Sequence, residues 1–169
     1  MKRILMGWAL TPLIAIVVVA LDQWSKSLIR LNLPVGATYA PVSALERWFS
    51  FTHTTNTGAA FGLFQGQGGI FVMIALMVII AVLYYSHQLP ADSWAIRVCL
   101  GLQIGGAAGN LIDRLRLGEV TDFALFTLPL GDKIYAWPAF NVADSAIVVG
   151  VLGMGYLLIV RPEGQKAAG

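Results

Sequence analysis

The stretch Trp137-Pro-Ala-Phe-Asn-Val-Ala-Asp-Ser-Ala146 opens the last apolar segment of the chain, which continues to Val160. Asp144 lies inside this segment, seven residues after Trp137. With the rise of a helix, its carboxyl is expected about 10 Å below a membrane boundary marked by the tryptophan. A carboxylate at that depth costs on the order of 3 kcal/mol, so we expect it to have a partner and a function. Asn141, three residues earlier, is expected on the same helix face.

The composition is typical of an integral membrane protein. Of the 169 residues, 57% are hydrophobic and 12% are charged, and the charged fraction is about half that of a soluble protein. The net charge of +2 and the lack of a run of Lys and Arg argue against a nucleic-acid partner. Cys99 is the single cysteine, so no internal disulfide forms, and its apolar neighbours favour a packing role over a catalytic thiol.

Four apolar runs predict a membrane α-helical fold, a single domain over 1–169 with four transmembrane helices. The spans are expected at about 4–21, 69–85, 94–112 and 137–160. The first run is longer than a signal-peptide core and lacks a cleavage site, so we interpret it as a retained span with a bend at Pro12. Four spans place both termini on one side, and Lys2 and Arg3 favour the cytoplasmic side.

The two long segments between spans, about 22–68 and 113–136, are then extracytoplasmic. Aromatic and β-branched residues predict one strand at 48–55 and a second at 120–130. The small residues of Asn56-Thr-Gly-Ala-Ala-Phe-Gly62 permit close approach of another backbone, although an ordinary turn is the commoner interpretation. His53 has one distant counterpart in the chain, which favours a surface or hydrogen-bonded histidine over a ligand or a base.

The third span carries a stripe of small residues. Gly101, Gly105 and Gly109 recur every four residues, the pattern of close helix packing in lipid, and we expect them to hold the bundle tight. Asn110 follows, with Asp113 and Arg114 on its face, which fits either a helix contact with an ion pair or a functional site.

Polar residues gather at one membrane face, and four of the six aspartates belong to this rim. The rim residues are Asp22, Asn110, Asp113, Arg114, Asp122, Asn141 and Asp144. Two distant histidines and no HExxH motif disfavour zinc hydrolysis, so we expect neither metal nor cofactor. Paired carboxylates remain, because one ionised and one protonated carboxyl can activate water against a peptide bond. Asp144 is the first member, and spacing leaves Asp122 and Asp113 as alternatives for the second.

Five blocks occur in an order that resembles bacterial lipoprotein signal peptidase (signal peptidase II) over nearly the whole chain. They are Asp22-Gln-Trp-Ser-Lys26, Asn56-Thr-Gly-Ala-Ala-Phe61, Gly106-Ala-Ala-Gly-Asn-Leu-Ile-Asp-Arg114, Val120-Thr-Asp-Phe123 and Phe140-Asn-Val-Ala-Asp-Ser145. The resemblance implies a four-span aspartic endopeptidase of the inner membrane, with a small extracytoplasmic β-sheet cradle and a flap helix. Such enzymes remove the signal peptide from diacylglyceryl-modified prolipoproteins, just before the lipidated cysteine.

The resemblance also implies residue roles. Asp122 and Asp144 match the catalytic dyad, with the site near the periplasmic face. Residues that shape the site or bind substrate are Asn56, Asn110, Arg114 and Asn141, and supporting residues are Asp22, Lys26, Gly58, Gly106, Asp113 and Ala143. The expected partners are the diacylglyceryl prolipoprotein and membrane lipid, with the enzyme a monomer. The segment 127–135 departs from the family pattern, which leaves the local shape of the cradle open.

Two other classes compete with a peptidase. A small transporter or proton relay that uses Asp144 predicts polar residues spread across the membrane depth and tolerates loss of Asp122. A non-catalytic scaffold predicts no function for paired aspartates. The gathering of polar residues at one rim argues against both.

Overall fold

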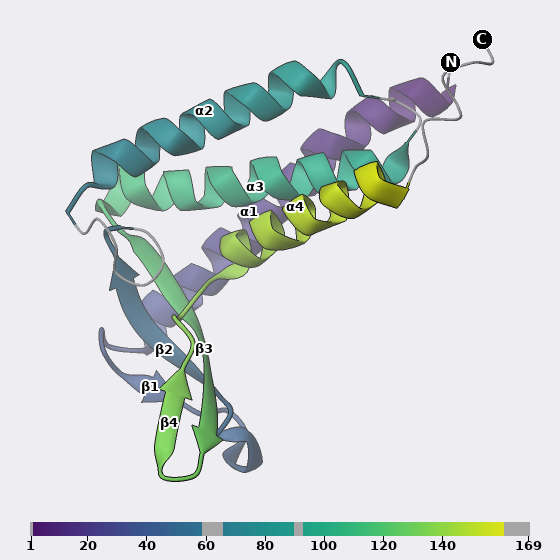
Figure 1. Ribbon diagram of the computed structural model, residues 1–169. Helices are drawn as coiled ribbons and strands as arrows, with labels where there is room; N and C mark the ends of the chain where they lie inside the picture. Colours follow the sequence, from purple (N-terminus) through teal and green to yellow (C-terminus); the bar gives the residue numbers. More distant parts are fainter. Residues whose placement is uncertain (1, 59–65, 90–92, 161–169) are drawn as a thin grey trace.

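Four long helices and one small antiparallel sheet make up the computed structural model, which describes residues 2–58, 66–89 and 93–160 (Figure 1). The helices are α1 (Lys2–Asn32), α2 (Gly68–Ser86), α3 (Trp94–Leu117) and α4 (Val142–Val160). All four are long and apolar enough to cross a membrane. The expected fold class, a four-helix membrane bundle with a small sheet, is confirmed.

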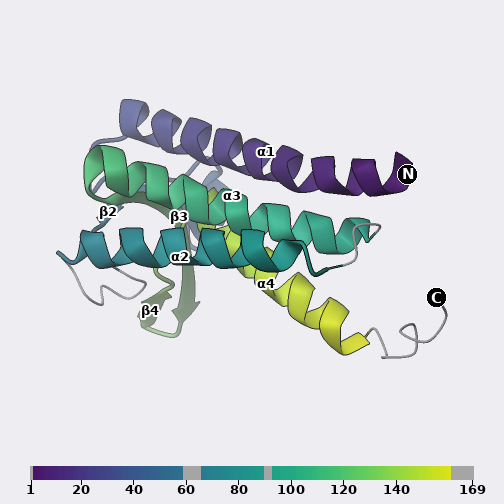
Figure 2. The ribbon, with the colours of Figure 1, turned by 90° about the horizontal axis from the view of Figure 1, so that it is seen from above.

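Helix α3 is the centre of the bundle. It packs against α1, α2 and α4, and Figure 2 shows it between α1 and α2. The glycine stripe explains the close approach to α1, because a Cβ added to Gly101 would lie 2.7 Å from the Cβ of Ile14. A Cβ added to Gly105 would meet the Cβ of Val18 at the same distance of 2.7 Å. The stripe therefore has the packing role that its spacing predicts.

Several helix boundaries differ from the expected spans. Helix α1 passes through Pro12 and continues beyond residue 21, so Asp22 and Lys26 lie inside it. Helix α3 continues beyond 112 and ends at Gly118, whose left-handed φ of 80° suits a glycine C-cap. Helix α4 begins at Val142 instead of 137, so the helical rise assumed between Trp137 and Asp144 is wrong. Asp144 lies in the first turn of α4.

The sheet has the order β1-β2-β3-β4, with all neighbours antiparallel. Its strands are β1 (Thr38–Tyr39), β2 (Phe49–Asn56), β3 (Val120–Leu130) and β4 (Lys133–Ala136). Strands β2 and β3 lie where the β-branched and aromatic residues predict them. The unmatched segment 127–135 forms the β3–β4 hairpin, in which Leu130 pairs with Lys133 across a turn containing Gly131 at a φ of 59°.

The sheet stands at one end of the bundle, beside the end of α1 and the start of α4 (Figure 1). This places β3 against the helix termini that carry the polar rim. A short 3₁₀ helix, η1 (Ser43–Leu45), falls in the first expected extracytoplasmic segment, 22–68, of which residues 59–65 lie outside the described chain.

Candidate active site

The start of α4 is held by side chains that accept its free N–H groups. Asn141 is the N-cap, since its Oδ1 accepts the N–H of Asp144 at 2.9 Å, and Asp144 Oδ2 accepts the N–H of Asn141 at 3.2 Å. This reciprocal pair is a capping box with Asp in the position usual for Glu. The N–H of Ala143 donates to Asp22 Oδ1 at 2.9 Å, which ties α4 to α1. The cap explains why the helix starts at Val142 and fixes the carboxyl of Asp144 at the helix end.

Asp122 comes to the same place from β3, where strand pairing sets it opposite Thr54. It is buried, and its Oδ1 accepts Asn141 Nδ2 at 2.7 Å while its Oδ2 accepts Asn56 Nδ2 at 3.1 Å. Asn141 thus bridges the two carboxyls, because its side chain binds Asp122 and its backbone binds Asp144. Asp144 Oδ1 also accepts Asn110 Nδ2 at 2.7 Å.

The orientation of all three asparagine side chains follows from groups that only donate. Each amide oxygen accepts one such donor, so its NH₂ group points the other way, to a carboxyl. The donors are the Lys26 ammonium for Asn110 at 2.9 Å, the Asp144 N–H for Asn141 at 2.9 Å and the Gly58 N–H for Asn56 at 3.0 Å. Both carboxyls therefore receive N–H donors on both oxygens.

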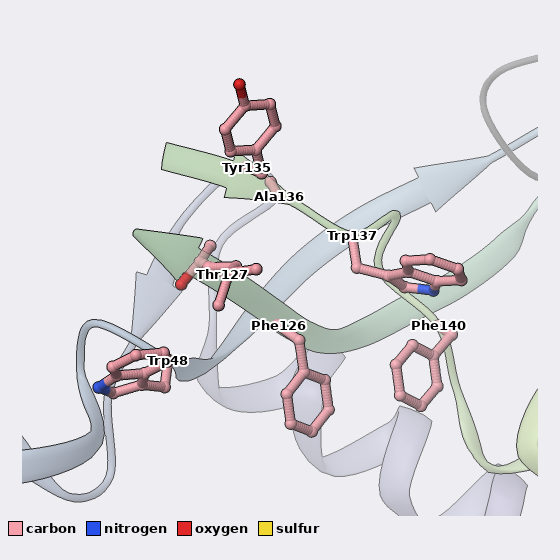
Figure 3. Close-up of a pocket in the computed structure, with 8 residues that line it drawn as sticks. Trp48, Phe126, Thr127, Tyr135, Ala136, Trp137 and Phe140 are labelled. Atoms are coloured by element: carbon pink, nitrogen blue, oxygen red, sulfur yellow. The ribbon is translucent and has the colours of Figure 1, made fainter. Parts of the chain in front are cut away.

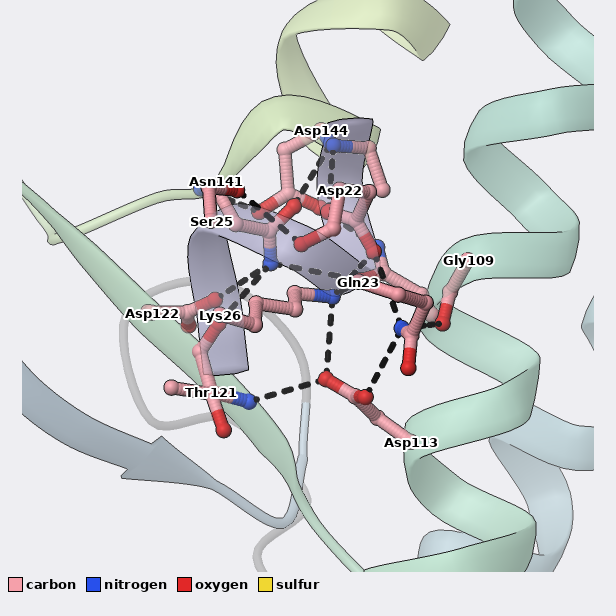
Figure 4. A network of polar contacts seen from close by, with 12 residues as sticks. Asp22, Gln23, Ser25, Lys26, Gly109, Asp113, Thr121, Asp122, Asn141 and Asp144 are labelled. Atoms are coloured by element: carbon pink, nitrogen blue, oxygen red, sulfur yellow. Dashed lines mark hydrogen bonds and ion pairs between the residues drawn. The ribbon is translucent and has the colours of Figure 1, made fainter. Parts of the chain in front are cut away.

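Behind the carboxyls lies a buried ion cluster centred on Lys26 (Figure 4). The Nζ of Lys26 is 2.9 Å from Asp22 Oδ2 and 2.9 Å from Asp113 Oδ2, and the three side chains are at most 1% exposed. Asp113 Oδ2 also lies 3.3 Å from the N–H of Thr121, which donates to it. Asp113 therefore anchors α3 to α1 and β3, away from the pocket that Asp122 and Asp144 share.

That pocket has a volume of about 680 Å³ and combines a polar end with an apolar wall. Its lining residues are Asn56, Gly58, Phe71, Asn110, Arg114, Val120, Asp122, Trp137, Pro138, Ala139, Phe140, Asp144, Ser145, Ile147, Val148 and Val149. Arg114 donates through one terminal nitrogen to the carbonyl of Gly58 at 3.1 Å, and its guanidinium lies 5.2 Å from the centre of the Phe71 ring. Arg114 is thus the cation that the pocket contains.

The environment of the pocket favours the protonated form of Asp122. Burial, and then the negative charge of Asp144, raise the pKa of Asp122 to about 7, against the opposing hydrogen bonds from Asn56 and Asn141 and the charge of Lys26. Two neighbouring carboxyls of this kind titrate as a pair. Asp122 therefore takes up its proton near neutral pH, beside the carboxyl of Asp144.

A second pocket of about 740 Å³ lies on the sheet (Figure 3). It is lined by Trp48, Phe126, Thr127, Leu128, Tyr135, Ala136, Trp137 and Phe140. Trp137 and Phe140 belong to both pockets, so the two adjoin. None of these lining residues is a carboxylate, whereas Asp122 and Asp144 line the other pocket.

The remaining expected residues serve packing or lie apart from the pocket. A Cβ on Gly106 would collide with the carbonyl oxygen of Ala143, so α3 and α4 touch there. His53 is buried with its Nδ1 2.7 Å from the carbonyl oxygen of Leu33, and Cys99 is buried in α3. Both fit the structural roles favoured from sequence.

Two polar residues of the cluster were missed. Gln23 donates to Asp113 Oδ1 at 3.0 Å, and Arg30 donates to Thr121 Oγ1 at 3.0 Å. The signal was present, because Arg30 follows Lys26 by four residues and so continues its helix face. In the described ranges no group of three or more His, Cys, Asp or Glu is placed to hold a metal ion.

Both the sequence and the fold are similar to those of known proteins. The family model described as signal peptidase (SPase) II matches residues 14–160. A lipoprotein signal peptidase of Moorella thermoacetica is 39% identical over 154 residues, which cover 91% of this chain and 95% of the relative. A lipoprotein signal peptidase of Desulfitobacterium hafniense is 41% identical over 151 residues, which cover 89% of this chain and 93% of the relative. A solved structure described as a bacterial membrane enzyme is 30% identical, with a TM-score of 0.80 over 94% of this chain and 93% of that one.

Proposed function

The chain belongs to the signal peptidase II family, and from that premise we propose that it is an aspartic endopeptidase that cuts diacylglyceryl-modified prolipoproteins. Members of the family are peptidases, and the four apolar helices make this one a multi-pass protein of the bacterial inner membrane. The cut removes the signal peptide just before the lipidated cysteine. Both termini are cytoplasmic, and the site opens near the periplasmic face.

One observation carries the catalytic proposal: Asn141 bridges Asp122 and Asp144 in a single pocket. The ionised carboxyl takes a proton from water while the water oxygen bonds to the scissile carbonyl carbon. The protonated carboxyl gives its proton to the carbonyl oxygen, which yields a neutral tetrahedral diol. When the C–N bond breaks, one diol hydroxyl loses a proton and the leaving amine gains one. The carboxyl pair ends with one proton, as it began.

The surrounding residues have separate roles in this scheme. Asn56, Asn110 and Asn141 orient the two carboxyls, because each points its NH₂ group at one of them. Arg114 is placed to bind the substrate backbone, because its Nε is buried and without a partner among the described residues. A buried N–H without a partner carries a free-energy cost, which a hydrogen bond to a substrate carbonyl would remove.

The shape of the pocket fits the two parts of the substrate. Apolar side chains of α4, Ile147 and Val148, continue from Asp144 into the bundle and suit the apolar signal segment. Phe71 of α2 faces the same space. One chain supplies both carboxyls, so the proposed chemistry needs no residue from a second copy.

The test is a cleavage assay with purified protein in lipid. The substrates are a prolipoprotein that carries diacylglycerol on its cysteine and the same precursor without the lipid. Asp122→Asn and Asp144→Asn are compared with Asp132→Asn, a matched change in the hairpin turn outside the pocket. We expect cleavage of the lipidated precursor alone, lost in the first two variants and kept in the third. A folded Asp122→Asn variant with full activity would overturn the dyad and favour Asp113 as the partner of Asp144, and a folded protein that cuts neither precursor would favour a relay through Asp144.

A further inference from the structure

Lys26 donates one of its three N–H bonds to an uncharged acceptor. The side chain is fully buried in α1, and two of its contacts are ion pairs with Asp22 and Asp113, both at 2.9 Å. These two pairs already more than balance its charge. The third contact, also at 2.9 Å, goes to the neutral amide oxygen of Asn110, on the side of the cluster that faces the two catalytic aspartates.

Asn110 stands between the ammonium and Asp144. Its Oδ1 accepts from Lys26 and, at 3.2 Å, from Asn141 Nδ2, while its Nδ2 donates to Asp144 Oδ1 at 2.7 Å. A flipped amide would turn its NH₂ group toward the ammonium, where two donors would meet, and its oxygen toward Asp144, where two acceptors would meet. Lys26 has no acceptor to offer, so it forbids this flip.

We propose that Lys26 is a positioning residue, whose ammonium fixes the orientation of the Asn110 amide and thereby keeps an N–H donor on Asp144. The catalytic consequence rests on the proposed function. The orientation itself does not, because it follows from the contacts of Lys26 and Asn110 whichever bond is cut. Without the ammonium, the weaker 3.2 Å contact from Asn141 is the one bond left to hold the amide oxygen.

The orientation matters because an N–H donor favours the ionised form of a carboxyl and an acceptor disfavours it. Charged groups act on the pair from several elements, and each stays in place when the amide turns. They are Asp22 and Lys26 from α1, Arg114 from α3 and the two aspartates themselves, while Asp113 acts on Arg114. Helix α2 has no charged residue. A turned amide therefore moves the titration of the pair to higher pH.

The experiment is a double-mutant cycle that asks whether Lys26 acts through Asn110. The variants are Lys26→Met, Asn110→Leu and the two combined. Arg30→Met is the matched control. Arg30 is a cation of the same cluster, but it contacts Thr121 and Asp113 and none of the asparagine amides that bond to the two aspartates. For each, kcat and KM are measured against pH with the lipidated precursor.

We expect Lys26→Met to lower kcat at least about tenfold, since small misplacement of a catalytic group has effects of this size, with KM little changed. The acidic midpoint of its pH profile moves up, and Arg30→Met leaves that midpoint in place. In the Asn110→Leu background, Lys26→Met should lower kcat no further and should keep only the smaller shift of the midpoint that loss of its charge causes directly. Equal effects of Lys26→Met in both backgrounds, or an unchanged pH profile, would overturn the proposal.

A second measurement does not depend on activity. NMR titration of ¹³C-carboxyl aspartate, with the Asp144 signal identified by its loss in Asp144→Asn, follows the carboxyl directly. If Lys26→Met folds poorly, Lys26→Met with Asp113→Asn removes one of the two carboxylates that lose the ammonium as a partner. The Asp144 titration should move more on loss of Lys26 when Asn110 is present than in the Asn110→Leu background, and it should stay in Arg30→Met. A titration that moves equally with and without Asn110 would refute the role of Lys26 in orienting the amide. This result would stand even if the wild-type protein cuts no precursor and the proposed function fails separately.

Discussion

Replacement of Asp122 by Asn should remove a pH dependence of stability that this one residue creates. The folded pKa of Asp122 is raised to about 7 by burial and by the charge of Asp144, above its ordinary value of 3.8. Between these two pH values the folded chain holds a proton that the unfolded chain has lost, so the free energy of unfolding falls as pH rises. The change is complete above the folded pKa, near pH 7.

The magnitude follows from the shift. Its size, 7 minus 3.8, is about 3 units, and at about 1.4 kcal/mol per unit the wild-type protein loses at most about 4 kcal/mol between pH 4 and pH 8. Asn does not titrate, so the variant lacks this loss. The variant also places an NH₂ group among the donors of Asn56 and Asn141, which costs about 1 to 3 kcal/mol at every pH. This cost is the same at every pH. It therefore cancels when the difference in free energy of unfolding between the two proteins is compared at two pH values.

The assay uses Cys99, which is the single cysteine and is buried in α3. A dye that becomes fluorescent on reaction with a thiol reports its exposure during thermal unfolding in detergent. The melting temperature of Asp122→Asn, measured relative to that of wild type, should be several degrees higher at pH 8 than at pH 5. The conversion is roughly 2 to 4 °C per kcal/mol. Parallel curves for the two proteins would refute the claim that a buried, proton-holding Asp122 sits beside a second carboxyl.

Three further predictions test other parts of the account. Gly101→Ala should lower the melting temperature by several degrees, because its Cβ would lie 2.7 Å from that of Ile14, whereas Gly155→Ala, with nothing within 4 Å, should not. Arg114→Lys should raise KM for the lipidated precursor about tenfold or more, because an ammonium cannot both bond the Gly58 carbonyl and cover the Phe71 ring as the planar guanidinium does; an unchanged KM would remove Arg114 from substrate binding. Prolonged dialysis against EDTA should leave cleavage unchanged, because the proposed water activation needs carboxyls alone, and loss of activity restored by a divalent metal would contradict it.

The helices and the main strands could be predicted because their signals are local. Apolar runs long enough to span a bilayer identify α2 at 69–85 to within a residue at each end. The aromatic and β-branched residues of 48–55 and 120–130 identify β2 and β3. The glycine stripe of α3 predicts a close helix contact, although it does not say that the partner is α1.

The start of α4 shows where local reasoning fails. A helical period places Asn141 and Asp144 on one face of a helix, whereas Asn141 is outside the helix as its N-cap. The sequence Asn141-Val-Ala-Asp144 has the spacing of a capping box, and Pro138 disfavours helix at Trp137, so the signal was available. The Gly131-Asp132 turn of the β3–β4 hairpin was readable in the same way.

Contacts between distant parts of the chain had no signal in a single sequence. The spacing of Asp22 and Lys26 predicts their pairing, but not that Asp113 shares the ammonium. Spacing also left Asp113 and Asp122 as equal candidates beside Asp144. The pairing of β3 with β2 brings Asp122 to the pocket, and the ion pair holds Asp113 in the cluster behind it.

The most direct test of the central claim, that Asp122 and Asp144 act as one catalytic unit, is a second double-mutant cycle. The kcat/KM of Asp122→Asn, Asp144→Asn and the double variant would be measured on the lipidated precursor, with folding checked through Cys99. Residues that act as a unit have strongly non-additive effects. We predict that each single variant falls about a thousandfold or more and that the double variant falls no further. Additive losses, or a single variant that keeps substantial activity, would contradict the account.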